Sequence, residues 1–332
     1  MFKEIKINYG MLENIAKNII IVDGITRSGK TLFNSIIPSL ERVEHTQVYN
    51  LIEQIVPAVS LRSIDPVYAR ALFRICLNEL VYNNSLSRNT NFRCDDNSGI
   101  LKYRNPEVYW KRLTRPDGED IVRELRSGNQ FLPIRTHEIM VNLEWFDLLD
   151  IDYYMLEVFR NPMDIIHSWW KRGWGERFGR DPRAFTLTIE FNGQPLPWYC
   201  VGKEAEWLKL NPIERCVHTV TDLIERAVEQ YKKASRKTRI HIIPFESFLQ
   251  NPQEHIKNIC QFLGTKPTVY TDYILRKDLR LSILDPKDRE KKRLEIQKGV
   301  KKELFEKAIE FAESYEFNLY GLKISNDDNS KF

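Results

Sequence analysis

Short apolar runs alternate with longer segments of helical periodicity along most of the chain. The run at 18–23 is almost wholly apolar and rich in isoleucine, which is typical of a strand covered on both faces. Similar short runs at 45–50, 130–135, 153–159 and 239–244 predict further strands. Because strands and helices alternate, the pattern predicts an α/β fold with a mainly parallel central sheet and helices on both faces.

Helical periodicity fills most of the segments between these strands. It predicts helices over 30–40, 51–84, 106–113, 118–127, 138–149, 161–170, 203–234, 252–263 and 286–316. Within the helical region 51–129, the polar stretch 85–99 is predicted to be a long loop, and 185–199 alternates like a small hairpin. We therefore expect a three-layer α/β/α sandwich in one domain, 1–318, with a helical cap inserted at 51–129 and a disordered tail at 319–332.

Composition narrows the class of protein but not its chemistry. The chain has 332 residues, 42% hydrophobic and 29% charged, as in an ordinary soluble globular protein. Its net charge of +4 is too small to suggest a nucleic-acid partner, although a local basic pocket stays open. Five scattered cysteines predict free thiols in a reducing compartment. No signal peptide or membrane span is recognisable, so we expect a cytoplasmic protein of unknown oligomeric state.

A glycine-containing turn follows the first predicted strand. Residues 24–31 read GITRSGKT and satisfy the pattern G-x-x-x-x-G-K-[ST], which binds nucleotide phosphates through backbone N–H groups and a lysine. The strand before it and the helix after it provide the structural context that the pattern requires. The sequence therefore predicts that a phosphate group binds at Arg27, Ser28, Gly29, Lys30 and Thr31, in a fold of the P-loop type.

The other predicted strand ends decide between two kinds of phosphate ligand. A P-loop NTPase needs a carboxylate on a neighbouring strand to hold Mg²⁺. Glu246 is the only carboxylate at these strand ends, whereas Arg135 and Arg160 end two of them. Basic strand ends favour an additional phosphate over a metal ion, and no metal site is predicted.

Two segments with related spacing give this chain a family resemblance. Residues 27–31 read RSGKT, and residues 160–168 read RNPMDIIHS. In this respect the chain resembles the PAPS-dependent sulfotransferases, whose fold is related to that of nucleotide kinases. The resemblance implies that the first segment holds the 5′-phosphosulfate of PAPS, and that Arg160 and Ser168 hold its 3′-phosphate.

Two further segments extend the resemblance over about residues 18–264. Arg135-Thr136-His137 stands where many cytosolic members have Lys-Thr-His, and 242–264 is similar to the late strand–helix element of the family. His137 is suited to remove the acceptor proton near neutral pH. The implied enzyme transfers a sulfuryl group from PAPS to a hydroxyl or amine of a small molecule, glycan or lipid, and releases PAP. Arg27 and Lys30 would act on the transferring group, without a metal.

Two departures from the family pattern leave alternatives open. Lys30 stands where relatives usually have threonine, which keeps open an ATP-dependent small-molecule kinase. Leu32 stands where many relatives have a tryptophan that stacks on adenine, and Phe33 is a possible substitute. A non-catalytic nucleotide-binding relative is the third alternative. We expect acceptor contacts in the loop 85–99 and a solvated helix face at 287–302.

Overall fold

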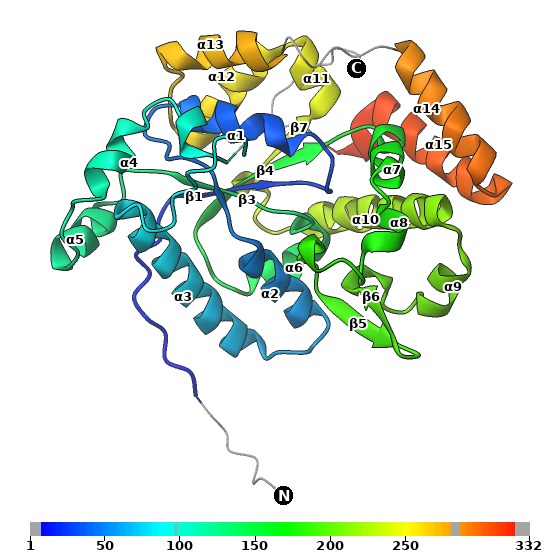
Figure 1. Ribbon diagram of the computed structural model, residues 1–332, viewed down its shortest axis with the longest axis horizontal. Coiled ribbons are helices and arrows are strands. Elements are labelled where there is room, and N and C mark those ends of the chain that lie inside the picture. Colours follow the sequence, from blue (N-terminus) through cyan, green and yellow to red (C-terminus); the bar gives the residue numbers. More distant parts are fainter. Residues whose placement is uncertain (1–7, 97, 280–285, 323–332) are drawn as a thin grey trace, which may run out of the picture.

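A computed structural model describes residues 8–96, 98–279 and 286–322. Its centre is a five-stranded sheet in the order β2-β3-β1-β4-β7, in which every pair of neighbours is parallel (Figure 1). The strands are β1 (Ile19–Asp23), β2 (Gln47–Val48), β3 (Leu132–Arg135), β4 (Tyr153–Phe159) and β7 (Ile240–Pro244). The predicted parallel sheet is confirmed, although the strand expected at 45–50 has only two residues.

Helices cover both faces of the sheet because successive residues of its strands point to opposite sides. On β1, Ile19 and Ile21 join one apolar cluster, and Ile20 and Val22 join the other. The helices packed against the first cluster are α2 (Asn50–Ser60), α3 (Pro66–Ser85), α6 (Leu143–Asp147), α7 (Pro162–Lys171), α10 (Pro212–Lys233) and α15 (Lys302–Asn318). Those packed against the second are α1 (Phe33–Ile36), α11 (Phe245–Gln250), α12 (Pro252–Leu263) and α13 (Val269–Leu279).

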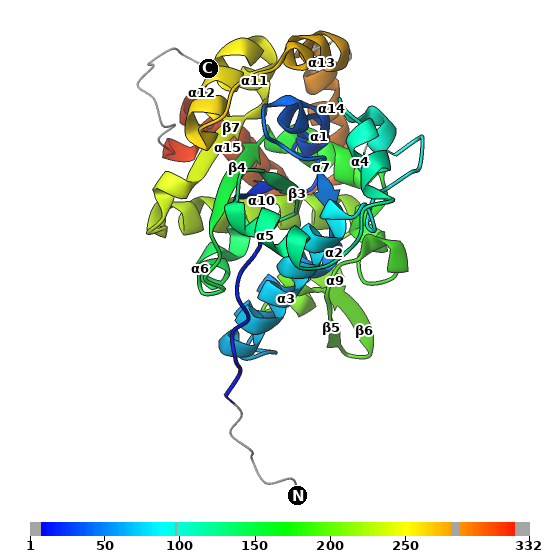
Figure 2. The same cartoon turned by 90° about the vertical axis from the view of Figure 1, so that its left-hand side faces the viewer.

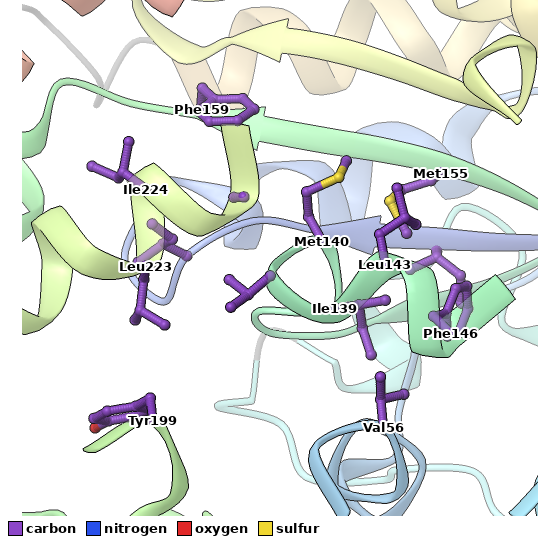
Figure 3. Packing of buried hydrophobic residues seen from close by; sticks show 14 of the residues in the cluster. Val56, Ile139, Met140, Leu143, Phe146, Met155, Phe159, Tyr199, Leu223 and Ile224 are labelled. Carbon is purple, nitrogen blue, oxygen red and sulfur yellow. The ribbon is translucent and has the colours of Figure 1, made fainter. Parts of the chain in front are cut away.

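Figures 1 and 2 show the resulting three layers, with α1, α12 and α13 above the sheet and α2 and α3 below it. Figure 3 shows the interior of the larger cluster, where Phe146 of α6 lies below Met155 of β4 and Val56 of α2 lies below Ile139. Each cluster contains two of the four inner residues of β1. The expected α/β/α sandwich is therefore the observed fold.

The long insertion between β2 and β3 contributes to two parts of the molecule. Its first helices, α2 and α3, belong to the lower layer, and Asp65 separates them by capping α3. Its later helices, α4 (Glu107–Arg112) and α5 (Glu119–Ser127), lie at the outer side of the sheet (Figure 1). The hydroxyl of Tyr109 joins α4 to the chain before β2 by accepting from the backbone N–H of His45.

Like the range 51–84, which α2 and α3 occupy, two later predicted helices are each divided in two. The helix expected at 203–234 is α9 (Glu204–Lys209) followed by α10, because Asn211 forms a capping box with Glu214 and Pro212 occupies the first helical position. The helix expected at 286–316 is α14 (Pro286–Gly299) followed by α15, and Lys301 between them is extended. Helix α13 was not predicted, because its apolar positions do not form a clear stripe.

The ordered chain continues beyond the predicted boundary at residue 318. Leu319 and Tyr320 are buried beside α15, so they belong to the domain rather than to a tail. The rest of the predicted tail, 323–332, lies outside the described residues. The predicted hairpin is present as β5 (Thr188–Phe191) and β6 (Gln194–Pro197), and all five cysteines are free thiols.

A steric prediction follows from the contact between α8 (Trp174–Arg177) and α10. A Cβ atom added to Gly175 would lie 2.0 Å from the carbonyl oxygen of Pro212. We expect Gly175→Ala to lower the free energy of unfolding by about 1–3 kcal/mol, because a packed backbone has to move. Urea denaturation measures this, with Gly10→Ala as control because nothing lies within 4 Å of its added Cβ. An unchanged midpoint for Gly175→Ala would contradict the prediction.

Candidate active site

The turn after β1 is built on unusual backbone conformations. Gly24 and Gly29 have φ of +142° and +103°, and Arg27, which has a side chain, has φ of +76°. A Cβ atom on Gly24 would lie 2.4 Å from the carbonyl oxygen of Val158, and one on Gly29 would lie 2.3 Å from the ring of Phe245. The turn is therefore seated tightly on the end of β4 and the start of α11. A positive φ is uncommon for a residue with a side chain, although Arg42 and Arg62 of this chain have it as well.

The structure brings the turn and the second predicted phosphate segment together. Arg27 Nε donates to Ser168 Oγ over 3.0 Å, and Arg160 Nη1 donates to the carbonyl oxygen of Arg27 over 3.3 Å. The Arg160 guanidinium also lies over the ring of Phe245, 4.9 Å from its centre. Two buried polar atoms here, Ser28 Oγ and Arg160 Nε, have no hydrogen-bond partner among the described residues. Their hydrogen-bonding capacity is not used by the described protein groups.

Positive charge accumulates around this point. Burial, and then the neighbouring Arg172 and Arg160, lower the pKa of Arg27. Asp164, the fourth residue after Arg160, lies 3.9 Å from its guanidinium. The same carboxylate also binds Arg289 at 3.1 Å and Lys292 at 2.8 Å. Arg289 also pairs with Glu246 and Glu316, so the cations left to face an anion are chiefly Arg27 and Arg160.

Helix α14 supplies two of these cations. Arg289 and Lys292 belong to the basic segment 287–302, which was expected to be a solvated helix face. The side of α14 that they occupy is instead in contact with α7, where Glu295 also binds His167 at 3.0 Å and Lys171 at 2.8 Å. The basic segment is therefore joined to the helix that carries Ser168.

His137 lies just beyond the end of β3 and is held by a residue of another element. Glu53 of α2 has an exposure of 7%, and its Oε2 accepts the backbone N–H of His137 over 2.8 Å. The same Oε2 lies 3.1 Å from His137 Nδ1. Burial and the nearby Lys30 lower the pKa of His137 to about 3. Burial raises the pKa of Glu53 to about 8.

A cavity of about 500 Å³ opens beside this histidine. Charged residues line one part of it, namely Arg135, Glu53, Glu138 and Asp96 of the loop 85–99. Aromatic residues form another part of the lining, namely Trp169, Trp174, Phe178, Phe185, Trp198 and Tyr199. Trp169 Nε1 donates to the carbonyl oxygen of Thr26 over 2.7 Å, so this part is tied directly to the turn. The cavity is thus lined both by Thr26 of the turn and by His137.

Comparison with known protein families shows to which family the chain belongs. The family model described as "Sulfotransferase domain" matches residues 17–308, which is most of the chain. The chain belongs to the sulfotransferase domain family. No curated protein matches it.

Three solved structures are among those to which this sulfotransferase-family chain is similar. The sulfotransferase domain of the Synechococcus PCC 7002 olefin synthase is 11% identical, over 93% of this chain and 98% of that chain, with a TM-score of 0.44. Sulfotransferase STF9 from Mycobacterium avium is 13% identical over 81% and 69%, with a TM-score of 0.41. STF1 from Mycobacterium tuberculosis H37Rv is 12% identical over 92% and 77%, also with a TM-score of 0.41.

The side chain of Lys30 points into the sulfotransferase domain rather than toward the open face of the turn. Its ammonium donates to the carbonyl oxygens of Gly24 and Ile25, and its exposure is 3%. Burial lowers the pKa of Lys30, and the nearby carboxylates of Asp23 and Glu157 oppose this shift. The expectation that Lys30 acts on the transferring group therefore needs correction, since its Nζ atom is occupied inside the turn.

A second sequence expectation fails at the start of α1. Phe33 has an exposure of 0% and packs on Phe248 with 4.8 Å between ring centres, so it cannot stack on an adenine. Thr31 and Leu32 line a separate pocket of about 690 Å³. The aromatic substitute that the sequence suggested is thus part of the core.

Glu246 at the end of β7 is engaged by protein groups. It accepts from the hydroxyl of Tyr315, and from the backbone N–H of Asn161 and the Arg289 guanidinium, both over 3.2 Å. Across the described residues, no group of three or more His, Cys, Asp or Glu side chains is arranged to hold a metal ion. No helix within those residues is long and apolar enough to cross a membrane.

The environment of His137 gives a pH prediction. Because its pKa is lowered in the folded protein, we expect the imidazole to stay neutral from pH 8 down to pH 5. The unfolded histidine, with a pKa of about 6.5, binds a proton in this range. The stability that His137 contributes is thus present above pH 6.5 and is lost as pH falls. Imidazole NMR, assigned with His137→Gln, tests this, and a midpoint above pH 6 for formation of the imidazolium cation would contradict it.

Proposed function

We propose that this chain is a sulfotransferase that moves a sulfuryl group from PAPS to an acceptor hydroxyl and releases PAP. The observation that carries the proposal is the convergence of the turn with Arg160 and Ser168. Such a pair of anion sites, one on the turn and one formed by Arg160 before α7 and Ser168 within it, matches a nucleotide that carries phosphates at both the 5′ and 3′ positions. Sulfuryl transfer requires that both ends of the donor nucleotide are held in place.

The residues present fit this donor. The turn would hold the 5′-phosphosulfate with its backbone N–H groups, the Arg27 guanidinium and the unpartnered Ser28 hydroxyl. Arg160 and Ser168 would hold the 3′-phosphate, with the unpartnered Nε of Arg160 as a further donor. Lys30 keeps the turn in shape from within. In this proposal it acts on the carbonyl oxygens of the turn and not on the donor.

The transfer step can be written with side chains of the cavity and of the turn. The acceptor oxygen forms a bond to sulfur while the bond from sulfur to the bridging phosphate oxygen breaks. His137 Nε2 takes the acceptor proton, and the electron pair of the broken bond remains on the phosphate of PAP, where Arg27 stabilises it. Arg135 lines the cavity two residues before His137 and has no ion-pair partner among the described residues. Its charge would offset that of the sulfuryl group in transit.

Glu53 sets which nitrogen of His137 can act. With one proton on the pair, Nδ1–H donates to the Glu53 carboxylate and Nε2 has a free electron pair. With two protons, the neutral pair has Glu53 O–H donating to Nδ1, and Nε2 then carries the other proton and cannot act as a base. Such a pair titrates as a unit. The raised pKa of Glu53, about 8, therefore controls when the base is available.

The kinase alternative has weaker support. It needs a P-loop lysine that reaches a phosphate, but the Lys30 ammonium is occupied by Gly24 and Ile25. It also needs the Glu246 carboxylate, which Tyr315 and Arg289 already engage. A non-catalytic relative would bind the nucleotide without modifying any acceptor, so measured turnover distinguishes it from the proposed enzyme.

Nucleotide binding tests the donor proposal. We expect PAP to bind more tightly than ADP, and Arg160→Ala to weaken PAP by about 10- to 100-fold, the range expected for hydrogen bonds to a charged group. ADP, which has no 3′-phosphate, should change less than threefold. Titration calorimetry measures both, with Arg123→Ala as control because Arg123 lies on the surface of α5. A preference for ADP would refute the proposal.

The pH dependence of turnover tests the His137–Glu53 pair. We expect the rate to rise with pH and to level off near pH 8, because the pair must lose its second proton before Nε2 can act. Glu53→Gln should remove this inflection and lower kcat by about 100-fold or more, since an amide cannot be deprotonated. His137→Ala should abolish turnover and leave PAP affinity unchanged.

The control for this experiment is Glu144→Gln, which removes an exposed carboxylate of α6 outside the cavity. It should keep the full pH profile. A Glu53→Gln enzyme with the same inflection as Glu144→Gln would show that Glu53 does not govern the base. Undiminished turnover in His137→Ala would remove His137 from the mechanism.

A further inference from the structure

The residues that line the cavity beside His137 limit which acceptors can bind there. This inference rests on the proposed function, because it assumes that the acceptor occupies that cavity. With a volume of about 500 Å³, the cavity is of the size that holds small molecules or one end of a longer one. Its two walls differ in chemistry, and each wall limits what can bind.

One wall presents aromatic rings. Trp174 and Phe178 are partly exposed and lie 5.4 Å apart between ring centres. Trp169 packs against both and is itself buried, which fixes the orientation of the two rings. Fixed aromatic faces of this kind bind a flat or ring-shaped group. This wall therefore favours a ring over a flexible chain.

Polar groups without partners lie along the same cavity. Tyr199 has an exposure of 7%, and its hydroxyl has no hydrogen-bond partner among the described residues. The same holds for Arg135 Nε. A buried polar atom without a partner costs about 1–3 kcal/mol, and a ligand hydroxyl that reaches it on binding recovers this free energy. An acceptor with several hydrogen-bonding groups can therefore gain more from this cavity than an apolar one.

The charged groups of the cavity exclude purely apolar acceptors. Glu53 and Glu138 line it together with Arg135, whereas Arg177 and Arg183 are already paired with Asp181. An acyl chain or an unsubstituted aromatic ring would remove these groups from water and give nothing in return. A ring with hydroxyls around its edge places apolar C–H faces on the aromatic wall and hydroxyls on the polar groups.

We propose that the acceptor is a sugar unit, a pyranose ring whose hydroxyl is sulfated at His137. Its face lies against Trp174 and Phe178, and a second hydroxyl bonds to Tyr199. Discrimination then comes from the polar groups, because a site built to bond a hydroxyl rejects compounds that lack it far more strongly than an apolar pocket rejects an added one.

Binding to the full chain saturated with PAP tests the acceptor class. The probes are the methyl pyranosides of glucose, galactose and mannose, together with 4-methylphenol and 1-octanol. We expect at least one pyranoside to bind ten times more tightly than 4-methylphenol and 1-octanol, measured by saturation-transfer NMR with competition. Tighter binding of 4-methylphenol or 1-octanol overturns the inference, and so does the failure of all three pyranosides to bind.

A single hydroxyl provides the matched variant. We expect Tyr199→Phe to raise KM for the pyranoside about tenfold, the effect of one lost hydrogen bond, with kcat within threefold and PAP affinity unchanged. Tyr320→Phe is the control, because the Tyr320 hydroxyl is also buried and without a partner among the described residues but lies beside α15. Equal KM values for the two variants overturn the role of Tyr199.

Failure of this inference is distinguishable from failure of the proposed function. If the chain binds ADP more tightly than PAP, the proposed sulfotransferase function is wrong, whether or not the chain binds sugars. A chain that binds PAP and sulfates 4-methylphenol but no pyranoside keeps the proposed function and loses the sugar.

Discussion

The contact between Arg27 and Ser168 is the interaction on which the rest of this site depends. It joins a turn near the start of the chain to a helix 141 positions later, over 3.0 Å. Parallel strands make the contact possible, because β1 and β4 are neighbours and their carboxyl ends meet at one edge of the sheet. Arg160 lies beside the turn, over the ring of Phe245. Two segments that are far apart in the sequence are thus in direct contact.

At this edge of the sheet, one basic side chain of the turn is buried and another faces outward. Lys30 is drawn inward, where Asp23 and Glu157 stand opposite each other on β1 and β4. A buried ammonium next to buried carboxylates is stable only with such partners. With Lys30 occupied inside, the outward charge of the turn comes from Arg27. A sequence pattern typical of ATP-binding turns is therefore compatible with a different donor, because the position of the lysine decides its use.

Local pattern predicted the central strands, the turn and the convergence of its partner segments, since each has a signal within a few neighbouring residues. Glu53 had no such signal, because its role arises from the packing of α2 against the end of β3, 84 positions apart in sequence. The inward turn of Lys30 was equally invisible, since it depends on carboxylates contributed by two strands. The division of the helix at 203–234 was readable in Asn211 and Pro212, but periodicity on both sides concealed it.

A crystal structure of the chain with PAP tests the central claim most directly. The account predicts the 3′-phosphate within hydrogen-bond distance of both the Arg160 guanidinium and the Ser168 hydroxyl, and the 5′-phosphate inside the turn at 24–31. A complex in which the 3′-phosphate points away from Arg160 and Ser168, or in which PAP occupies another part of the molecule, would contradict it.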